Sequence, residues 1–198
     1  PMIAGGRTIK KLYPDCTTVF ISPCLAKKAE AREEDIAGAI DYVITFEEVF
    51  QLLQLLGLDP EKEPADDKDN TSGMGRLYAR SGGVSCAVGS TVRALDPDRR
   101  IRDLHAEGVP ACRELLNSLK EGRISADYIE GMGCAGGCVG GPKTTADRET
   151  ARARTDELAK GAAFPTPKDN PFVFKLLDEL GLDTLEKLQS SEIFSRKF

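Results

Sequence analysis

Apolar and polar positions along the chain follow two periods, one typical of short strands and one typical of helices. The β-branched and aromatic run 17–21 (TTVFI), bounded by Pro23, predicts a buried strand. A second strand is predicted at 41–45 (DYVIT). Thr45 is followed three residues later by Glu48, the arrangement of a capping box, so a helix is expected to begin there.

Helical spacing accounts for much of the remaining chain, and one more strand is predicted at 126–130. The charged stretch 59–73 has no apolar period and is expected to be a loop. Apolar residues at helical spacing predict further helices after the turn 81–83 and around 109–119 and 172–180. A polar, charged helix is expected at 147–160 and a short one at 184–188. Strands that alternate with helices indicate an α/β fold with a mostly parallel sheet flanked by helices.

Length and composition describe an ordinary globular protein. A chain of 198 residues fits one domain or two small lobes that share a cleft. The net charge of −5, with lysines and arginines scattered among carboxylates, argues against a nucleic-acid partner. No apolar run is long enough for a membrane span, and no signal sequence opens the chain. We therefore expect a cytoplasmic protein whose six cysteines are thiols or metal ligands.

The topology of an open α/β sheet predicts where the chemistry lies. Ligands bind beyond the carboxyl ends of the strands in such sheets. Cys24 directly follows the first predicted strand, while Cys134 and Cys138 follow the strand that ends at Glu130. These three cysteines are therefore expected to meet at one edge of the sheet and to share a thiolate site.

The segment 130–142 (EGMGCAGGCVGGP) is the most specific motif. Its glycines allow close approach to a bulky inorganic group and supply amides for cluster sulfurs. Cys134 and Cys138, spaced C-x-x-x-C, could ligate one cluster or a zinc ion, or they could form a redox dithiol. Zinc needs two more ligands, and the only histidine, His105, lies in an unrelated segment. Redox dithiols favour C-x-x-C, and a purely structural loop is the remaining alternative.

The segment 22–30 (SPCLAKKAE) places Cys24 before Lys27 and Lys28. A nearby cation lowers the pKa of a thiol and favours the thiolate that binds metal. The structural alternative is a buried cysteine at a strand end, with both lysines on a solvated helix.

The other reactive side chains give weaker signals. Cys16 and Cys112 are expected to pack in the core, and Cys86 is expected to be exposed. His105 has no evident partner and is expected to be a surface or packing residue rather than a catalyst. The turn 80–83 (RSGG) at a helix start could bind an anion, a weak indication of a nucleotide site.

Two separated motifs resemble a known family. The pattern P-C-x-x-K-x-x-E from Pro23, and E-x-M-x-C-x-G-G-C-x-G-G from Glu130, are similar to the iron-only hydrogenase large subunit, C-terminal domain. The segment 77–84 (LYARSGGV) resembles the F-G-A-T-G-G-V turn of that family. The resemblance covers most of residues 1–142, and it implies a C-terminal part of the catalytic domain over 1–145, with a helical extension over 146–198 packed on it.

The resemblance implies an H-cluster, a 4Fe–4S cubane joined through a cysteine to a di-iron unit with CO, cyanide and a dithiolate. It implies reversible oxidation of hydrogen to protons and electrons, exchanged with a ferredoxin-like partner. By the same resemblance Cys24, Cys134 and Cys138 ligate the cubane, and Cys138 also bridges to the di-iron unit. Lys27 points at a cyanide ligand, while Met132 and Tyr78 line the di-iron cavity.

Departures from the family pattern modify these expectations. The T-S-C-C-P motif, which supplies the fourth cubane cysteine and a proton-relay cysteine, falls before Pro1 in the alignment. The chain is therefore expected to be a fragment that lacks an N-terminal part and holds no H-cluster by itself. Three departures resemble the sensory or regulatory branches of the family. Ser22 stands where catalytic members usually have methionine, Pro142-Lys143 replaces a Gly-Gln pair, and Arg80-Ser81 is a variant of the family turn. A relative that binds only cubanes and a flavodoxin-like anion or nucleotide binder are the alternatives.

Overall fold

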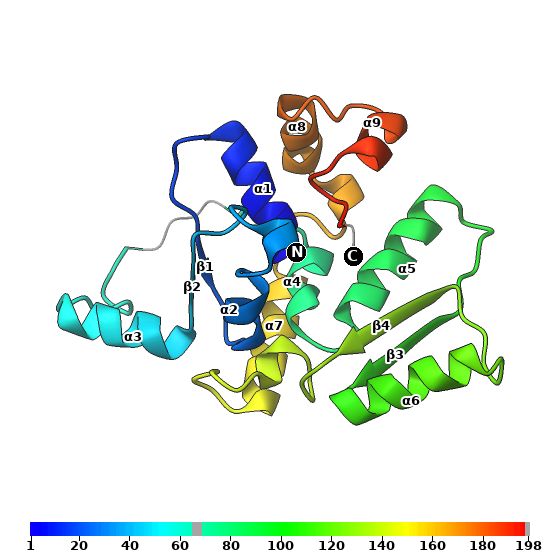
Figure 1. Ribbon diagram of the computed structural model, residues 1–198, viewed down its shortest axis with the longest axis horizontal. Coiled ribbons are helices and arrows are strands. Elements are labelled where there is room, and N and C mark those ends of the chain that lie inside the picture. The colour runs from blue at the N-terminus through cyan, green and yellow to red at the C-terminus, as the bar shows by residue number, and fades with distance from the viewer. Residues whose placement is uncertain (65–68, 197–198) are drawn as a thin grey trace. The chain divides into compact units, whose positions relative to one another are not determined.

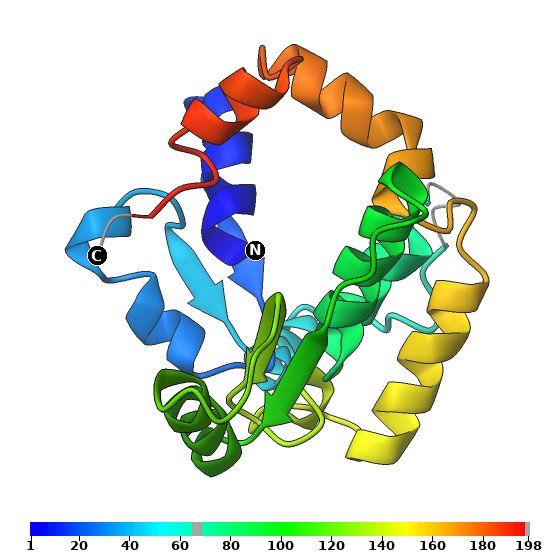
Figure 2. The same cartoon turned by 90° about the vertical axis from the view of Figure 1, so that its right-hand side faces the viewer.

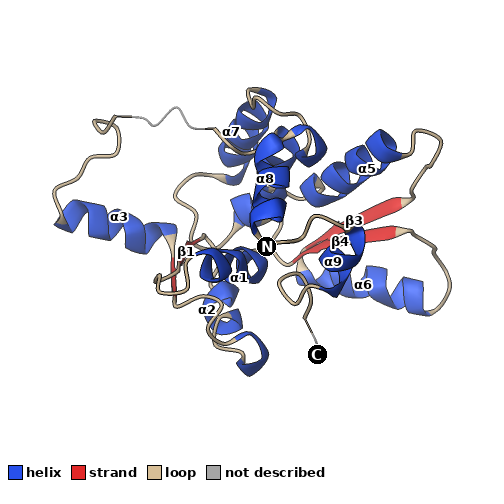
Figure 3. Ribbon diagram, turned by 90° about the horizontal axis from the view of Figure 1, so that it is seen from above, coloured by secondary structure: helices blue, strands red, loops and turns tan. Residues whose placement is uncertain are grey.

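Two parallel strand pairs organise the computed structural model, which describes residues 1–64 and 69–196 (Figure 1). Strand β1 (Val19–Ile21) pairs with β2 (Tyr42–Ile44), and β3 (Asp103–Glu107) pairs with β4 (Tyr128–Met132). Helices supply most of the remaining secondary structure, as Figure 3 shows with strands in red. The predicted α/β class with parallel strands is confirmed.

The two pairs form separate sheets and belong to different compact units. Unit 1 comprises Pro1–Asp66 and Phe172–Phe198, and unit 2 comprises Asp67–Pro171. The expectation of one sheet with both cysteine segments at its edge is therefore wrong, because β1 and β4 lie in different sheets. The predicted boundary between residues 145 and 146 stays a prediction. By internal contacts, residues 146–171 belong to unit 2 and 172–198 to unit 1.

Unit 1 joins the N-terminal third of the chain to its C-terminal helices. Its core contains the buried residues Leu180, Leu182 and Ile193, against which Leu12 and Leu188 pack. The Lys11 ammonium also donates a hydrogen bond to the carbonyl of Leu180 at 2.8 Å. The helices assigned to this unit are α1 (Met2–Leu12), α2 (Ala26–Glu30), α3 (Phe46–Leu55), α8 (Pro171–Glu179) and α9 (Leu185–Ser190).

The predicted start of α3 is confirmed in detail. The backbone N–H of Glu48 donates to the Thr45 hydroxyl at 3.2 Å, and the Thr45 N–H donates to the Glu48 carboxylate at 2.7 Å. The first predicted strand exists as β1 but is not buried. Val19 and Ile21 are each about half exposed, at 50% and 49%.

Unit 2 contains the sheet β3–β4 between two helices. Figures 1 and 2 show α5 (Gly83–Leu95) along one face of this sheet and α6 (Val109–Lys120) along the other. Helix α7 (Arg148–Lys160) packs against the short helix α4 (Gly73–Arg76). Backbone N–H groups of α4 donate to the segment after α7, as Gly73 does to the carbonyl of Phe164 at 2.8 Å.

Several elements were not predicted or were displaced. Strand β3 was missed because its sequence, DLHAE, is charged and poor in β-branched residues. Strand β4 runs two residues further than predicted and so ends at Met132. Helices α1 and α4 were also missed, and each contains two glycines, which weaken helical propensity. No helix within residues 1–64 and 69–196 is long and apolar enough to span a membrane.

Candidate functional site

A glycine-rich loop that carries two cysteines follows β4 in unit 2. Cys134 is half-buried, and Cys138 is exposed at the start of a short 3-10 turn, Cys138–Gly140. Gly136 and Gly137 are buried between them, and both have a φ of +83°, which favours glycine. A Cβ on Gly137 would lie 2.5 Å from the backbone nitrogen of Ser81. The loop therefore packs directly on the turn that precedes α5.

Hydrogen bonds hold the middle of this loop from two sides. The N–H of Gly136 donates to Oε2 of Glu107 at 2.6 Å, and Glu107 is the last residue of β3. The carbonyl of Gly136 accepts from the N–H of Ser81 at 3.0 Å. The side chain of Arg148 covers the loop, since a Cβ on Gly136 would lie 2.5 Å from its Cδ. Contacts from β3, from the turn before α5 and from α7 thus shape the loop.

Glu130 joins the start of the cysteine motif to the start of α5. Glu130 is buried, with only 4% of its surface exposed. Its carboxylate accepts from the N–H groups of Gly82 at 2.8 Å and Ser85 at 2.7 Å. An anionic side chain stabilises a helix N-terminus because the free amides there carry partial positive charge.

This arrangement bears on the anion site predicted at residues 80–83. The amides of Gly82 and Ser85 are already satisfied by Glu130, so a phosphate would have to displace a buried carboxylate to reach them. The Arg80 guanidinium pairs with the carboxylate of Asp156 on α7. The groups that suggested a nucleotide site therefore serve internal structure.

Cys24 lies in unit 1, in the turn between β1 and α2. Its N–H donates to the hydroxyl of buried Ser22 at 3.2 Å. The Lys27 ammonium pairs with Glu30, and Lys28 pairs with Glu48 at 2.6 Å. Because Cys24 and the cysteine loop belong to different units, their meeting in one site stays a prediction.

Met132 and Tyr78 lie in the same unit as the cysteine loop. Met132 ends β4 and is half-buried, and its carbonyl accepts from the N–H of Gly108 at 2.8 Å. Tyr78 lies in the 3-10 turn Leu77–Ala79 and is also half-buried. Burial raises the pKa of Tyr128 above its usual value, with smaller contributions from Glu130 and Tyr78. Tyr78 and Met132 thus belong to the same compact unit as the cysteine loop.

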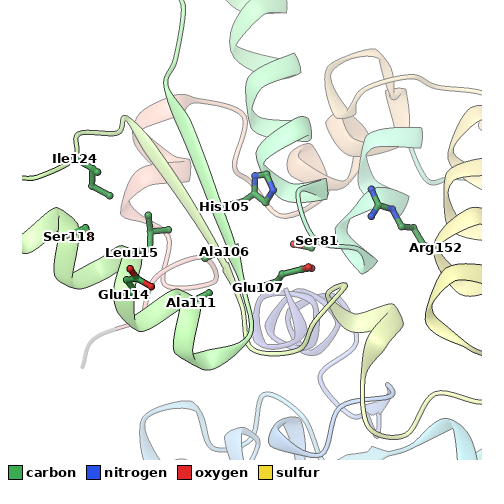
Figure 4. A pocket seen from close by; sticks show the side chains of 10 residues that line it. All are labelled: Ser81, His105, Ala106, Glu107, Ala111, Glu114, Leu115, Ser118, Ile124 and Arg152. Atoms are coloured by element: carbon green, nitrogen blue, oxygen red, sulfur yellow. The ribbon is translucent and has the colours of Figure 1, made fainter.

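An open pocket of about 530 Å³ lies beside the loop in unit 2 (Figure 4). It is lined on one side by Ser81, His105, Glu107 and Arg152. His105 is exposed, the first of the two positions expected for it, and the expectation that its segment is unrelated to the motif is wrong. It lies on β3 in register with Glu130 of β4. The pocket therefore gives solvent access to Glu107, the residue that binds the loop.

The remaining cysteines occupy structural positions. The Cys112 thiol lies 3.5 Å from the carbonyl oxygens of Ala106 and Met132, in agreement with the packing predicted for it. Cys86 was expected to be exposed but is half-buried, with its sulfur 3.8 Å from that of Met74. Cys16 is half-buried before β1.

The roles of Glu107 and Glu130 were missed in the sequence. The motif identifies Glu130 only as its first residue, although a carboxylate within the run YIE of a strand indicates a buried, partnered charge. Glu107 had no such signal, because β3 itself was not predicted. The Gly136 contact joins residues 29 apart, a separation that no local pattern encodes.

The available ligands fit an iron–sulfur cubane in kind but not in number. Thiolates are the ligands that hold 4Fe–4S clusters, and four are needed. The loop offers Cys134 and Cys138 in unit 2, and Cys24 in unit 1 offers a third. Within either unit, the described residues contain no group of three His, Cys, Asp or Glu side chains arranged around a metal ion.

Comparison with known proteins agrees with the motifs. The chain is 29% identical to the NADP-reducing hydrogenase subunit HndD of Solidesulfovibrio fructosivorans, over 90% of this chain and 39% of that protein. It is 26% identical to the periplasmic [Fe] hydrogenase large subunit of Nitratidesulfovibrio vulgaris, over 69% of this chain and 41% of that protein. The chain thus spans about two fifths of the length of these curated relatives.

Solved structures show the same fold at low identity. A variant of the [FeFe]-hydrogenase HydA1 from Chlamydomonas reinhardtii superposes with a TM-score of 0.63 at 20% identity, covering 89% of this chain and 63% of that one. Residues 1–142 match the family described as iron only hydrogenase large subunit, C-terminal domain. The chain therefore belongs to this family of iron-only hydrogenase domains.

Proposed function

We propose that this chain is the C-terminal part of an H-cluster domain, in a protein that oxidises hydrogen reversibly or senses it. The observation that carries the proposal is the loop 133–138, which holds two cysteines in a shape fixed by Ser81 and Glu107. A preformed ligand loop lowers the entropic cost of cluster binding. Membership of the iron-only hydrogenase family supplies the chemical context.

In this proposal the thiolates of Cys24, Cys134 and Cys138 hold the cubane, and Cys138 also bridges to the di-iron unit. When bound, the H-cluster supplies the iron centre at which hydrogen is converted reversibly to protons and electrons. Lys27, which pairs with Glu30, would supply the cation that faces a cyanide ligand of the di-iron unit. Met132 and Tyr78 exclude water around the di-iron unit.

The proposal includes partners beyond this chain. A segment N-terminal to Pro1 supplies the fourth cubane cysteine, since three thiolates leave one iron without a protein ligand. A ferredoxin-like protein exchanges electrons with the cluster, and the protein works in the cytoplasm. Anaerobic reconstitution with iron and sulfide tests the first point. The chain of 198 residues should hold little stable cubane, and a protein extended upstream should hold one.

Within this family, we propose a sensory or regulatory role for the protein. Ser22 stands where catalytic members usually have a methionine, and its hydroxyl accepts a hydrogen bond from the N–H of Cys24 at 3.2 Å. The alternative is a relative that binds cubanes only. Infrared spectra of the extended, matured protein distinguish an H-cluster protein from a relative that binds cubanes only. Bands of iron-bound CO and cyanide are expected for the H-cluster, whereas a cubane without these bands would favour the alternative.

A further inference from the structure

Glu107 occupies a special position relative to the cysteine loop. It ends β3, and its carboxylate accepts the N–H of Gly136 at 2.6 Å. The carbonyl of Gly136 accepts the N–H of Ser81 at 3.0 Å. The two peptide groups that flank the Gly136 Cα are therefore held by different elements. Gly136 has a φ of +83° and lies two residues from each cysteine.

We infer that Glu107 is a positioning residue that holds Cys134 and Cys138 ready for the cluster before the cluster arrives. The inference rests on the proposed function of this loop as a cluster ligand. Hydrogen bonds to an ionised acceptor are stronger than neutral ones, so a carboxylate fixes the Gly136 peptide more firmly than an amide oxygen would. The Gly136 N–H is also already engaged by Glu107, at 2.6 Å.

The carboxylate has a second consequence for a bound cluster. The reduction potentials of iron–sulfur clusters depend on nearby charge and on hydrogen bonds to the sulfurs. Glu107 adds a negative charge beside the loop and takes one amide donor. It therefore lowers the potential of a cubane bound by Cys134 and Cys138. Replacement by glutamine separates the two effects, because it keeps a hydrogen-bond acceptor and removes the charge.

Amide exchange in the metal-free chain tests the positioning role. In Glu107→Ala the Gly136 amide should exchange about tenfold faster or more, because the bond to a charged acceptor is lost. Glu107→Gln should restore exchange to within about threefold of the parent. Glu114→Ala is the matched control, since Glu114 lines the same pocket from α6. The Ala106 amide, within β3, should stay protected in every variant and report that unit 2 is folded.

The positioning role is overturned if Glu107→Ala leaves Gly136 exchange unchanged, or if Glu114→Ala accelerates it equally.

A redox titration of the reconstituted, upstream-extended protein tests the effect of the Glu107 charge on the cubane potential. The cubane potential should rise in Glu107→Gln and stay constant in Glu114→Gln, and an unchanged potential in Glu107→Gln contradicts that effect. Failure of the unsubstituted extended protein to bind any cubane would refute the proposed function, while the exchange measurement still judges whether Glu107 holds the loop.

Discussion

The carboxylate of Glu130 accepts a hydrogen bond from the backbone N–H of Gly82, 48 residues earlier in the chain, at 2.8 Å. The same side chain accepts from Ser85 at 2.7 Å. One buried charge thus connects β4, which leads into the cysteine loop, with the first turn of α5. The two family motifs of unit 2 are therefore one structural assembly.

Loss of this carboxylate should destabilise unit 2 strongly. Glu130→Ala leaves the N–H groups of Gly82 and Ser85 buried without their acceptor, and we expect a loss of about 3 kcal/mol in the free energy of unfolding. Urea denaturation followed by circular dichroism measures it. Glu130→Gln should cost less, since one acceptor oxygen remains. Glu114→Ala, on exposed α6 surface, should change the value by less than about 0.5 kcal/mol.

Two glycines of the cysteine loop should respond differently to alanine. Gly137 has a φ of +83°, and a Cβ there would lie 2.5 Å from the Ser81 nitrogen, so Gly137→Ala should displace the loop. The left-handed conformation alone costs about 1–2 kcal/mol for alanine. Gly133 has open space around its Cβ position and no positive φ, so Gly133→Ala should be tolerated. Equal stability of the two variants in urea would contradict the packing described for Gly137.

Local sequence signals predicted local structure well. The capping box at Thr45 and Glu48 needs only residues within one helical turn, and the structure contains both of its hydrogen bonds. The glycine turn before α5 and the helical spacing in α6 were likewise sufficient. Missed elements lacked such signals. Helix α1 contains Gly6, where a Cβ would lie 2.1 Å from the carbonyl oxygen of Ala39, so packing rather than propensity explains that glycine.

Relationships across the chain could not be predicted in the same way. The cysteines of the loop were recognisable from spacing and glycine content. The groups that hold the loop, Glu107 and Ser81, come from segments 29 and 55 residues away, and no periodic pattern links them to Gly136. The division of β1 and β4 between two sheets also depends on strand pairing over long separations, which alternation within one strand does not specify.

Acid should weaken unit 1 through two carboxylates. The Lys10 ammonium and Thr18 lower the pKa of Asp41 from 3.8 to about 2, and the Lys28 ammonium and Thr45 lower the pKa of Glu48 from 4.5 to about 2. Groups with a lowered pKa in the folded state stabilise it above their unfolded pKa, and this contribution disappears as pH falls toward the folded pKa. Stability should therefore fall from about pH 5 down to about pH 2.

Asp41→Asn tests this pH dependence directly. Urea denaturation at several pH values should give a shallower acid decline for the variant than for the parent, because one carboxylate with a strongly lowered pKa is gone. Asp178→Asn is a suitable control, since Asp178 is an exposed carboxylate of α8 in the same unit. An identical decline in the parent and in Asp41→Asn would refute the assignment.

Lys27 and Lys28 should differ in the matured, upstream-extended protein. Lys27→Ala leaves every thiolate in place, so the cubane should remain, but under the proposed role of Lys27 the di-iron unit would lose its cationic anchor. CO and cyanide bands in the infrared spectrum should then be weak or missing. Lys28 pairs with Glu48 at the start of α3, and Lys28→Ala should give the parent spectrum. Equal loss of the CO and cyanide bands in both variants would mean that diffuse positive charge is enough to retain the di-iron unit, without a specific role for Lys27.

The iron content of the extended protein with Cys138 replaced by alanine tests most directly whether the cysteine loop binds the cluster. If Cys138 holds the cubane and the di-iron unit as proposed, Cys138→Ala removes both attachments, so the cubane absorption and the CO and cyanide bands should disappear. Cys112→Ala removes a thiol that packs against Ala106 and Met132, and it should retain both signals. Full iron content and unchanged infrared bands in Cys138→Ala would contradict the assignment of the cysteine loop as the cluster ligand.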